Sequence, residues 1–147
     1  MIMKLANQFI DYYNRNNLLT INADPKTIKG NKKGFLTAIM YLSPHKLSGK
    51  NLCPFASIGC ILACLNISGR GKMDYTQEAR LNRSLFFTKN KKLFMLNIVR
   101  RVNNFIKLAK KKNMIPVIRL NGTSDIMFEN IKISCEDLLN DKYINKY

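Results

Sequence analysis

The strongest fold signal in this sequence is an apolar run, FLTAIMYL, at residues 35–42. The run is nearly continuous and rich in β-forming residues, which is typical of a strand buried on both faces, as in a parallel sheet. Ser43 and Pro44 end it. A second run of the same kind, MIPVIRL (114–120), leads into a turn, NGTSD (121–125). The two runs predict two buried, parallel strands.

The long segment between these runs predicts helices. Residues 75–88 have a helical pattern that Thr76 can cap, and residues 91–112 place an apolar face opposite basic side chains. A strand, a helical crossover and a second strand usually form a right-handed parallel βαβ unit. We therefore expect an α/β fold: a partial parallel βαβ sheet packed with several helices in a single compact domain.

We expect one domain over the whole chain, with three parts. They are an N-terminal helix (1–20, helical at 3–16), an α/β core (21–130), and a C-terminal helix with a basic tail (131–147, helical at 135–142). Before the first apolar run the sequence predicts a short strand (18–22) and a basic loop with glycines (23–34).

The charge balance is strongly basic. The chain has 25 Lys+Arg and 9 Asp+Glu, a formal net charge of +16. No acidic residue lies between Asp24 and Asp74 or between Glu78 and Asp125. So much charge of one sign destabilises the compact state by self-repulsion. A solvated helix face accounts for part of it, but the pattern favours a polyanionic partner such as nucleic acid or a ribonucleoprotein.

The candidate nucleic-acid-binding residues are cations in and near the acid-free stretches. They are Arg70, Lys72, Arg80, Arg83, Lys91, Lys92, Arg100, Arg101, Lys107, Lys110, Lys111 and Lys112. The segment SGRGK (68–72) can form an anion nest around a phosphate, or only a helix end followed by a turn. The aromatic residues near these cations can stack on bases or belong to the core. They are Tyr12, Tyr13, Tyr41, Phe86 and Phe87.

Three cysteines lie in one segment, NLCPFASIGCILACLNISGRGK (51–72). Its centre has helical character, so Cys60 and Cys64 would share a helix face, and Cys53 precedes that helix. Three thiolates can hold zinc with a fourth ligand, or an iron–sulfur cluster with an open iron position. The candidate fourth ligands are His45 and Cys135. The alternatives are buried core thiols and a disulfide.

Topology predicts where these residues meet. Parallel strands point their carboxyl ends toward one edge of a sheet, where ligand sites gather in α/β folds. His45, Cys53 and Asp125 should therefore be neighbours. The sequence shows no signal peptide and no run near the ~20 apolar residues of a membrane span. We expect a cytoplasmic protein without membrane contact, in which cysteines stay reduced or bind metal.

Four motifs resemble a phage family known as gene product eighty-eight. SPHKLSG, CPFAS-GC---CLN, GRGK and RLNGTSD occur in the same order, and the resemblance covers roughly residues 20–130. Family members loosely resemble phage proteins of the radical S-adenosylmethionine type. That analogy implies an iron–sulfur cluster on Cys53, Cys60 and Cys64, with Asn121, Ser124 and Asp125 lining the site. Because family members continue past NGTSD, the resemblance also implies an N-terminal short form.

These features predict a small basic phage-encoded accessory protein rather than an enzyme. Its expected partner is nucleic acid or a host ribonucleoprotein, and one expected role is inhibition of a CRISPR-type host defence. The first alternative is a radical-SAM-like enzyme with an iron–sulfur or zinc centre on the three clustered cysteines. The second is a structural or assembly factor of the virion.

Overall fold

The protein contains one mixed sheet of three strands in the order β1-β2-β3, in a computed structural model that describes residues 18–22, 24–134 and 136. The strands are β1 (Thr20–Ile21), β2 (Phe35–Ile39) and β3 (Ile115–Arg119). β2 and β3 are parallel, while β1 pairs with β2 antiparallel. The expected α/β class and parallel pair are confirmed, and the antiparallel β1 makes the sheet mixed.

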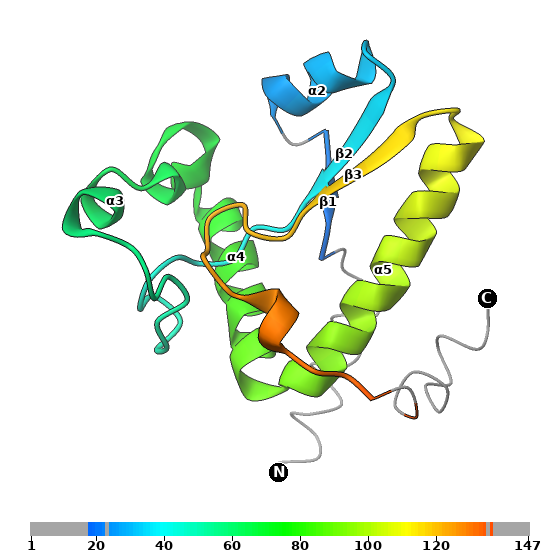
Figure 1. The fold of residues 1–147 in the computed structure, drawn as a ribbon. Helices are drawn as coiled ribbons and strands as arrows, with labels where there is room; N and C mark the ends of the chain where they lie inside the picture. The colour runs from blue at the N-terminus through cyan, green and yellow to red at the C-terminus, as the bar shows by residue number, and fades with distance from the viewer. Residues whose placement is uncertain (1–17, 23, 135, 137–147) are drawn as a thin grey trace.

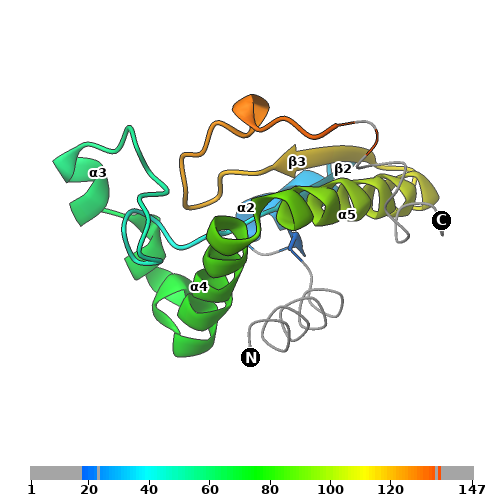
Figure 2. The ribbon, with the colours of Figure 1, turned by 90° about the horizontal axis from the view of Figure 1, so that it is seen from below.

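The crossover between β2 and β3 consists mainly of two long helices, as predicted. They are α4 (Asp74–Lys89) and α5 (Lys91–Lys111), preceded by the short α3 (Ile58–Leu62) and by two 3-10 turns, η1 (Leu65–Ile67) and η2 (Gly69–Lys72). α5 runs beside β3, and α3 projects at one end of the molecule (Figures 1 and 2). A further 3-10 turn, η3 (Phe128–Asn130), follows β3. No helix among the described residues is long and apolar enough to cross a membrane.

The predicted loop at 23–34 is wrong, because it contains helix α2 (Pro25–Asn31). Asp24 caps this helix: its carboxylate accepts a hydrogen bond from the backbone N–H of Thr27 at 2.9 Å. The Asp24 N–H donates in return to Oγ1 of Thr27 at 3.4 Å. Asp before Pro, with Thr three positions on, is a helix-start signal, and the sequence reasoning missed it.

The core lies between one face of the sheet and the two long helices. Alternate residues of the central strand segment face it: Leu36, Ala38 and Met40. Phe94 of α5 packs edge-to-face against Phe86 and Phe87, with ring centroids 5.3 and 5.2 Å apart. Phe86 and Phe87 are therefore core residues and do not stack on bases. Outside the described residues lie Tyr12, Tyr13, Cys135, the helix predicted at 3–16 and, apart from Glu136, the helix predicted at 135–142.

β3 is not buried on both faces as predicted. Its burial alternates: Ile115 and Val117 are 58% and 38% exposed, whereas Ile118 packs against the core. β3 is the last strand of the sheet in the described residues, and these residues leave the face that carries Ile115 and Val117 partly open. An apolar run alone did not distinguish this half-exposed strand from a buried strand.

The helix predicted around Cys60 and Cys64 is shorter than expected. α3 ends at Leu62, and Cys64 has extended backbone angles, φ −63° and ψ 132°. Cys64 therefore lies outside the helix, and the two thiols do not share a helix face. The start of α4 also differs from the prediction: its N-cap is Met73, not Thr76.

Candidate functional site

The loops that follow β2 and β3 lie side by side at the carboxyl edge of the sheet. The N–H of Gly122 donates to the carbonyl of Met40 at 3.0 Å. Further along, the hydroxyl of Thr123 donates to the carbonyl of Leu42. This contact between residues distant in sequence follows from the parallel pairing of β2 and β3, and the adjacency predicted from topology is confirmed.

Cys53 lies at the centre of this contact. Its Sγ accepts a hydrogen bond from the N–H of His45 at 3.2 Å and lies 3.8 Å from the carbonyl oxygen of Thr123. The N–H of Asp125 donates to the carbonyl of Leu52, the residue before Cys53, at 2.9 Å. Burial raises the pKa of the Cys53 thiol, although the hydrogen bond from His45 opposes that change. The protonated Cys53 thiol therefore joins the two loops, which is a structural role.

Of the four candidate metal ligands, Cys53 lies beside His45 and interacts electrostatically with Cys64. Cys60 is exposed, Cys53 and Cys64 are partly buried, and all three are free thiols. His45 contacts Cys53 through its backbone N–H, with its own backbone at φ 50°. Across residues 18–22, 24–134 and 136, no three His, Cys, Asp or Glu side chains are grouped as metal ligands would be. The metal site stays a prediction, because Cys135, another candidate ligand, lies outside the described residues.

The three thiols should react at different rates. We expect a thiol-specific alkylating reagent at pH 8 to modify Cys60 first and Cys53 last, by a factor of about 10 or more. The thiolate is the reactive form, and burial disfavours it at Cys53. Peptide mapping by mass spectrometry at successive times would measure the order. In 6 M urea the difference should vanish, and equal rates in the folded protein would contradict the position of Cys53.

The turn NGTSD uses its polar side chains to fold itself. Oδ1 of Asn121 accepts from the N–H of Ile126 at 3.1 Å and from Oγ of Ser124 at 3.0 Å. The amide of Asn121 donates to the carbonyl of Ile126 at 2.9 Å. Asn121, Ser124 and Asp125, the predicted ligand-binding residues, thus close or flank the turn. Gly122 and Thr123 of the same turn, by contrast, line an open cleft beside it.

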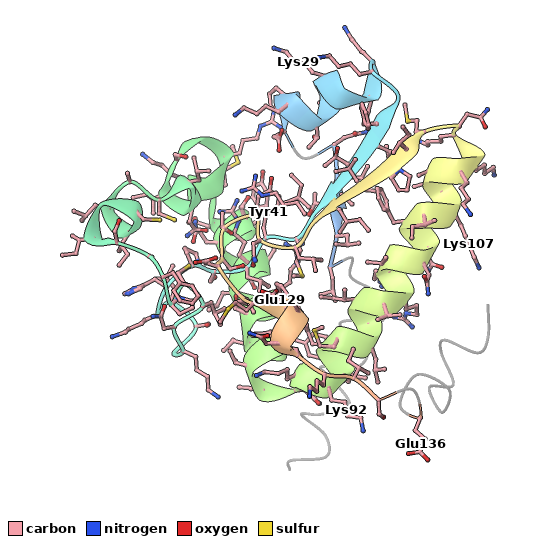
Figure 3. All side chains as sticks on the ribbon, viewed as in Figure 1. Lys29, Tyr41, Lys92, Lys107, Glu129 and Glu136 are labelled. Carbon is pink, nitrogen blue, oxygen red and sulfur yellow. The ribbon has the colours of Figure 1, made fainter. Side chains whose placement is uncertain are left out.

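An open cleft of about 890 Å³ lies between α2, the η2 turn, the first half of α4 and the ends of β2 and β3. Its cationic lining residues are Lys26, Lys29, Arg70, Arg80, Arg83 and Arg119, and its carboxylate is Asp24. Figure 3 shows Tyr41, another lining residue, at the end of β2 near the middle of the molecule. Sequence reasoning selected Arg70, Arg80 and Arg83 but missed the other three cations, which belong to α2 and β3.

A buried polar network builds the wall of the cleft. Asn66 is fully buried, and its Oδ1 accepts a hydrogen bond from Nη1 of Arg80. Gln77 Nε2 donates to the carbonyl of Asn66 at 2.7 Å and also to the carbonyl of Gly71. The Asn66 amide donates back to Oε1 of Gln77 at 2.9 Å. This network fixes the GRGK turn against α4.

Gly71 is where the turn comes closest to its neighbours. A Cβ at this position would lie 2.8 Å from the carbonyl oxygen of Asn66 and 3.2 Å from Nη1 of Arg80. The N–H of Gly71 donates to the carbonyl of Ser68 at 2.9 Å, inside the turn. The glycine therefore serves close packing, and the segment supplies the cleft with the side chain of Arg70.

Tyr41 forms the floor of the cleft and carries electrostatic contacts of both signs. Its hydroxyl donates to Asp24 at 3.3 Å, and the Arg80 guanidinium lies 5.0 Å from its ring centroid. Burial and the Asp24 carboxylate raise the pKa of Tyr41. Tyr41 is therefore neutral at physiological pH, and the cation–π contact with Arg80 is maintained.

The remaining predicted nucleic-acid-binding residues do not line this cleft. Lys72 is exposed beside it, and the others belong to α5 or follow it: Lys91, Lys92, Arg100, Arg101, Lys107, Lys110, Lys111 and Lys112. Figure 3 shows Lys92 and Lys107 on α5, well away from Tyr41. Lys92, Arg100, Arg101 and Lys107 each interact with other groups of the protein. The cations predicted as one set are therefore divided between the cleft and α5.

A family model described as Gene product 88 matches residues 13–139. No curated protein and no solved structure matches the chain. The match spans the sheet, the cysteine segment, both long helices and the cleft.

Proposed function

The chain belongs to the gene product 88 family of phage proteins, and we propose that it is a small basic accessory protein that binds nucleic acid. The observation that carries this proposal is the cleft, where six cationic side chains face one carboxylate. That carboxylate, on Asp24, already caps α2 and accepts a hydrogen bond from Tyr41. The cleft therefore presents net positive charge to a ligand.

The net charge of the chain supports the same conclusion. A formal charge of +16 raises the local concentration of polyanions and speeds their association. Phosphate contacts then dominate affinity, because each one releases counterions from the nucleic acid. A metal-dependent enzyme has no comparable support, since the described residues contain no group of three possible metal ligands.

Salt dependence tests this function. With about four phosphate contacts to a single strand, affinity should fall about 50-fold between 50 and 200 mM salt. Fluorescence anisotropy of a labelled oligonucleotide measures it. We expect the double variant Arg70→Gln, Arg119→Gln to reduce the slope of log K against log salt by about 1.4. The matched variant Lys110→Gln, Lys111→Gln removes equal charge from α5 and should change the slope less.

Two outcomes would redirect the proposal. Undetectable binding to DNA and RNA at about 50 mM salt would overturn it. A pull-down from host extract with and without nuclease gives the second outcome: a host nucleoprotein that remains bound after nuclease would identify a protein partner. For a phage protein, such a partner would be consistent with action on a nucleic-acid-guided host defence.

A further inference from the structure

We propose that the cleft binds one unpaired nucleotide unit, with its phosphate near Arg80 and its base against Tyr75. This inference rests on the proposed function and specifies its ligand. The nucleotide can come from a single strand or be a free nucleoside phosphate, because both present the same chemical groups to the cleft.

Arg80 is a buried cation with no acidic partner among the described residues. Its side chain lines the cleft, yet the residue is only 8% exposed. Within the described residues its partners are neutral: the amide oxygen of Asn66 and the ring of Tyr41. Its Nε is buried and has no hydrogen-bond partner there. Burial lowers the pKa of Arg80, as expected for a cation removed from water.

A buried charge is normally paired with an opposite one. Among the described residues no carboxylate contacts Arg80, while further cations line the same cleft, including Arg70 and Arg119. Self-repulsion among these groups opposes folding of this region unless an anion is bound. A phosphate, which accepts several hydrogen bonds from arginine, supplies the missing charge.

Tyr75 is an exposed aromatic side chain that lines the same cleft. It is 68% exposed, and its hydroxyl contacts Sδ of Met73 at 2.9 Å. Leu65, also a lining residue, is 66% exposed. Exposed aromatic and apolar surface beside grouped cations suits a ligand that has both a flat ring and a phosphate.

The size of the cleft favours an unpaired nucleotide over a duplex. A volume of about 890 Å³ lies within the range of pockets that hold small ligands. A duplex keeps its bases stacked inside and offers mainly phosphates and groove edges. Only an unpaired base can lie flat against Tyr75 while its phosphate approaches Arg80.

The variant Asn66→Asp tests the role of Arg80. It places a carboxylate where the Asn66 amide oxygen now accepts from Arg80, so the cation gains a partner inside the protein. It also removes the amide that donates to Oε1 of Gln77, so urea unfolding of the variant must show that it is still folded under the binding conditions. We expect affinity for a 12-nucleotide single strand to fall at least 10-fold, with the circular dichroism spectrum unchanged. The double variant Lys110→Gln, Lys111→Gln, on α5, should change the single-strand affinity by less than threefold. A folded Asn66→Asp protein that binds as tightly as wild type would overturn the inference.

Tyr75→Ala provides an independent test that does not disturb the buried network. We expect single-strand affinity to fall about 10-fold and duplex affinity to stay within twofold, because stacking is lost only for unpaired bases. Equal losses for both ligands, or none, would overturn the site. If the site is overturned but wild type still shows salt-dependent binding, the proposed nucleic-acid-binding function stands. If wild type does not bind nucleic acid, both the function and the nucleotide site are overturned.

The probes can also identify the source of the nucleotide. Tighter binding of a 5′-phosphorylated strand than of its unphosphorylated form would place a strand end in the cleft, and equal binding an internal nucleotide. Competition by a nucleoside triphosphate at micromolar concentration would identify a free nucleotide. For each probe, weaker binding by Asn66→Asp than by wild type supports the site. Unchanged binding by Asn66→Asp overturns it.

Discussion

Replacing Gly122 by alanine is expected to lower the free energy of unfolding by about 3 kcal/mol. A Cβ at this position would lie 2.6 Å from Cδ1 of Tyr41 and 2.7 Å from the carbonyl oxygen of Met40. That oxygen also accepts the Gly122 N–H, so separating the atoms weakens the hydrogen bond that joins the two loops. Tyr41 has little room to move, because it lies between Asp24 and Arg80.

Urea unfolding followed by circular dichroism measures this loss, since the chain has no tryptophan to report it. In a chain of this size the midpoint of thermal unfolding should fall by about 6–12 °C. Gly59→Ala is the matched control: its nearest neighbour would be Oγ of Ser57 at 3.9 Å, in helix α3. The control should retain or slightly gain stability. Wild-type stability of Gly122→Ala would contradict the close packing of the loop on β2.

Much of the fold was predictable because its signals are local. The apolar run at 35–42 and the amphipathic pattern at 91–112 indicated β2 and α5, and the order of elements then indicated the parallel pair. The antiparallel β1 was not predictable, since two residues carry no pairing information. The exposure of Ile115 and Val117 depends on which elements pack on that face of β3, which is a property of the tertiary structure.

The candidate site was predictable only in part, because it depends on contacts distant in sequence. Topology correctly placed His45, Cys53 and Asp125 together, but the metal interpretation assumed a helix that ends before Cys64. The charge pattern indicated a polyanion partner and selected Arg80, yet it gave no means of separating cleft residues from those on α5. In the sequence, Asn66 is only one residue of the cysteine motif. Its burial against Arg80 and Gln77 depends on the tertiary structure.

The exposed apolar side chains near α3 show the same dependence on tertiary structure. Phe55, Ile58 and Leu62 are 66%, 78% and 72% exposed. Sequence reasoning assigned this segment to a metal-binding or core helix, since apolar residues usually face inward. In the structure α3 is too short to form an amphipathic face and projects at one end of the molecule (Figure 1).

Asn66→Ala should have the second large effect, a loss of about 3 kcal/mol in the free energy of unfolding. The substitution removes the only hydrogen bond that the Arg80 guanidinium makes among the described residues and leaves Oε1 of Gln77 without its donor. Because Asn66 is fully buried, water cannot replace these bonds without opening the η1 and η2 turns. The same urea titration measures the change.

Ser68→Ala is the control for Asn66→Ala, because its hydroxyl donates to the carbonyl of Leu65 at 3.1 Å in an exposed part of the same turns. We expect it to change stability by less than about 0.5 kcal/mol. If a bound nucleotide neutralises Arg80, saturating oligonucleotide should raise the unfolding midpoint of wild type more than that of Asn66→Ala, since a disordered wall binds less tightly. Equal stability of Asn66→Ala and Ser68→Ala would show that the network does not hold the wall, and the cleft would then lack the fixed Arg80 on which its proposed ligand depends.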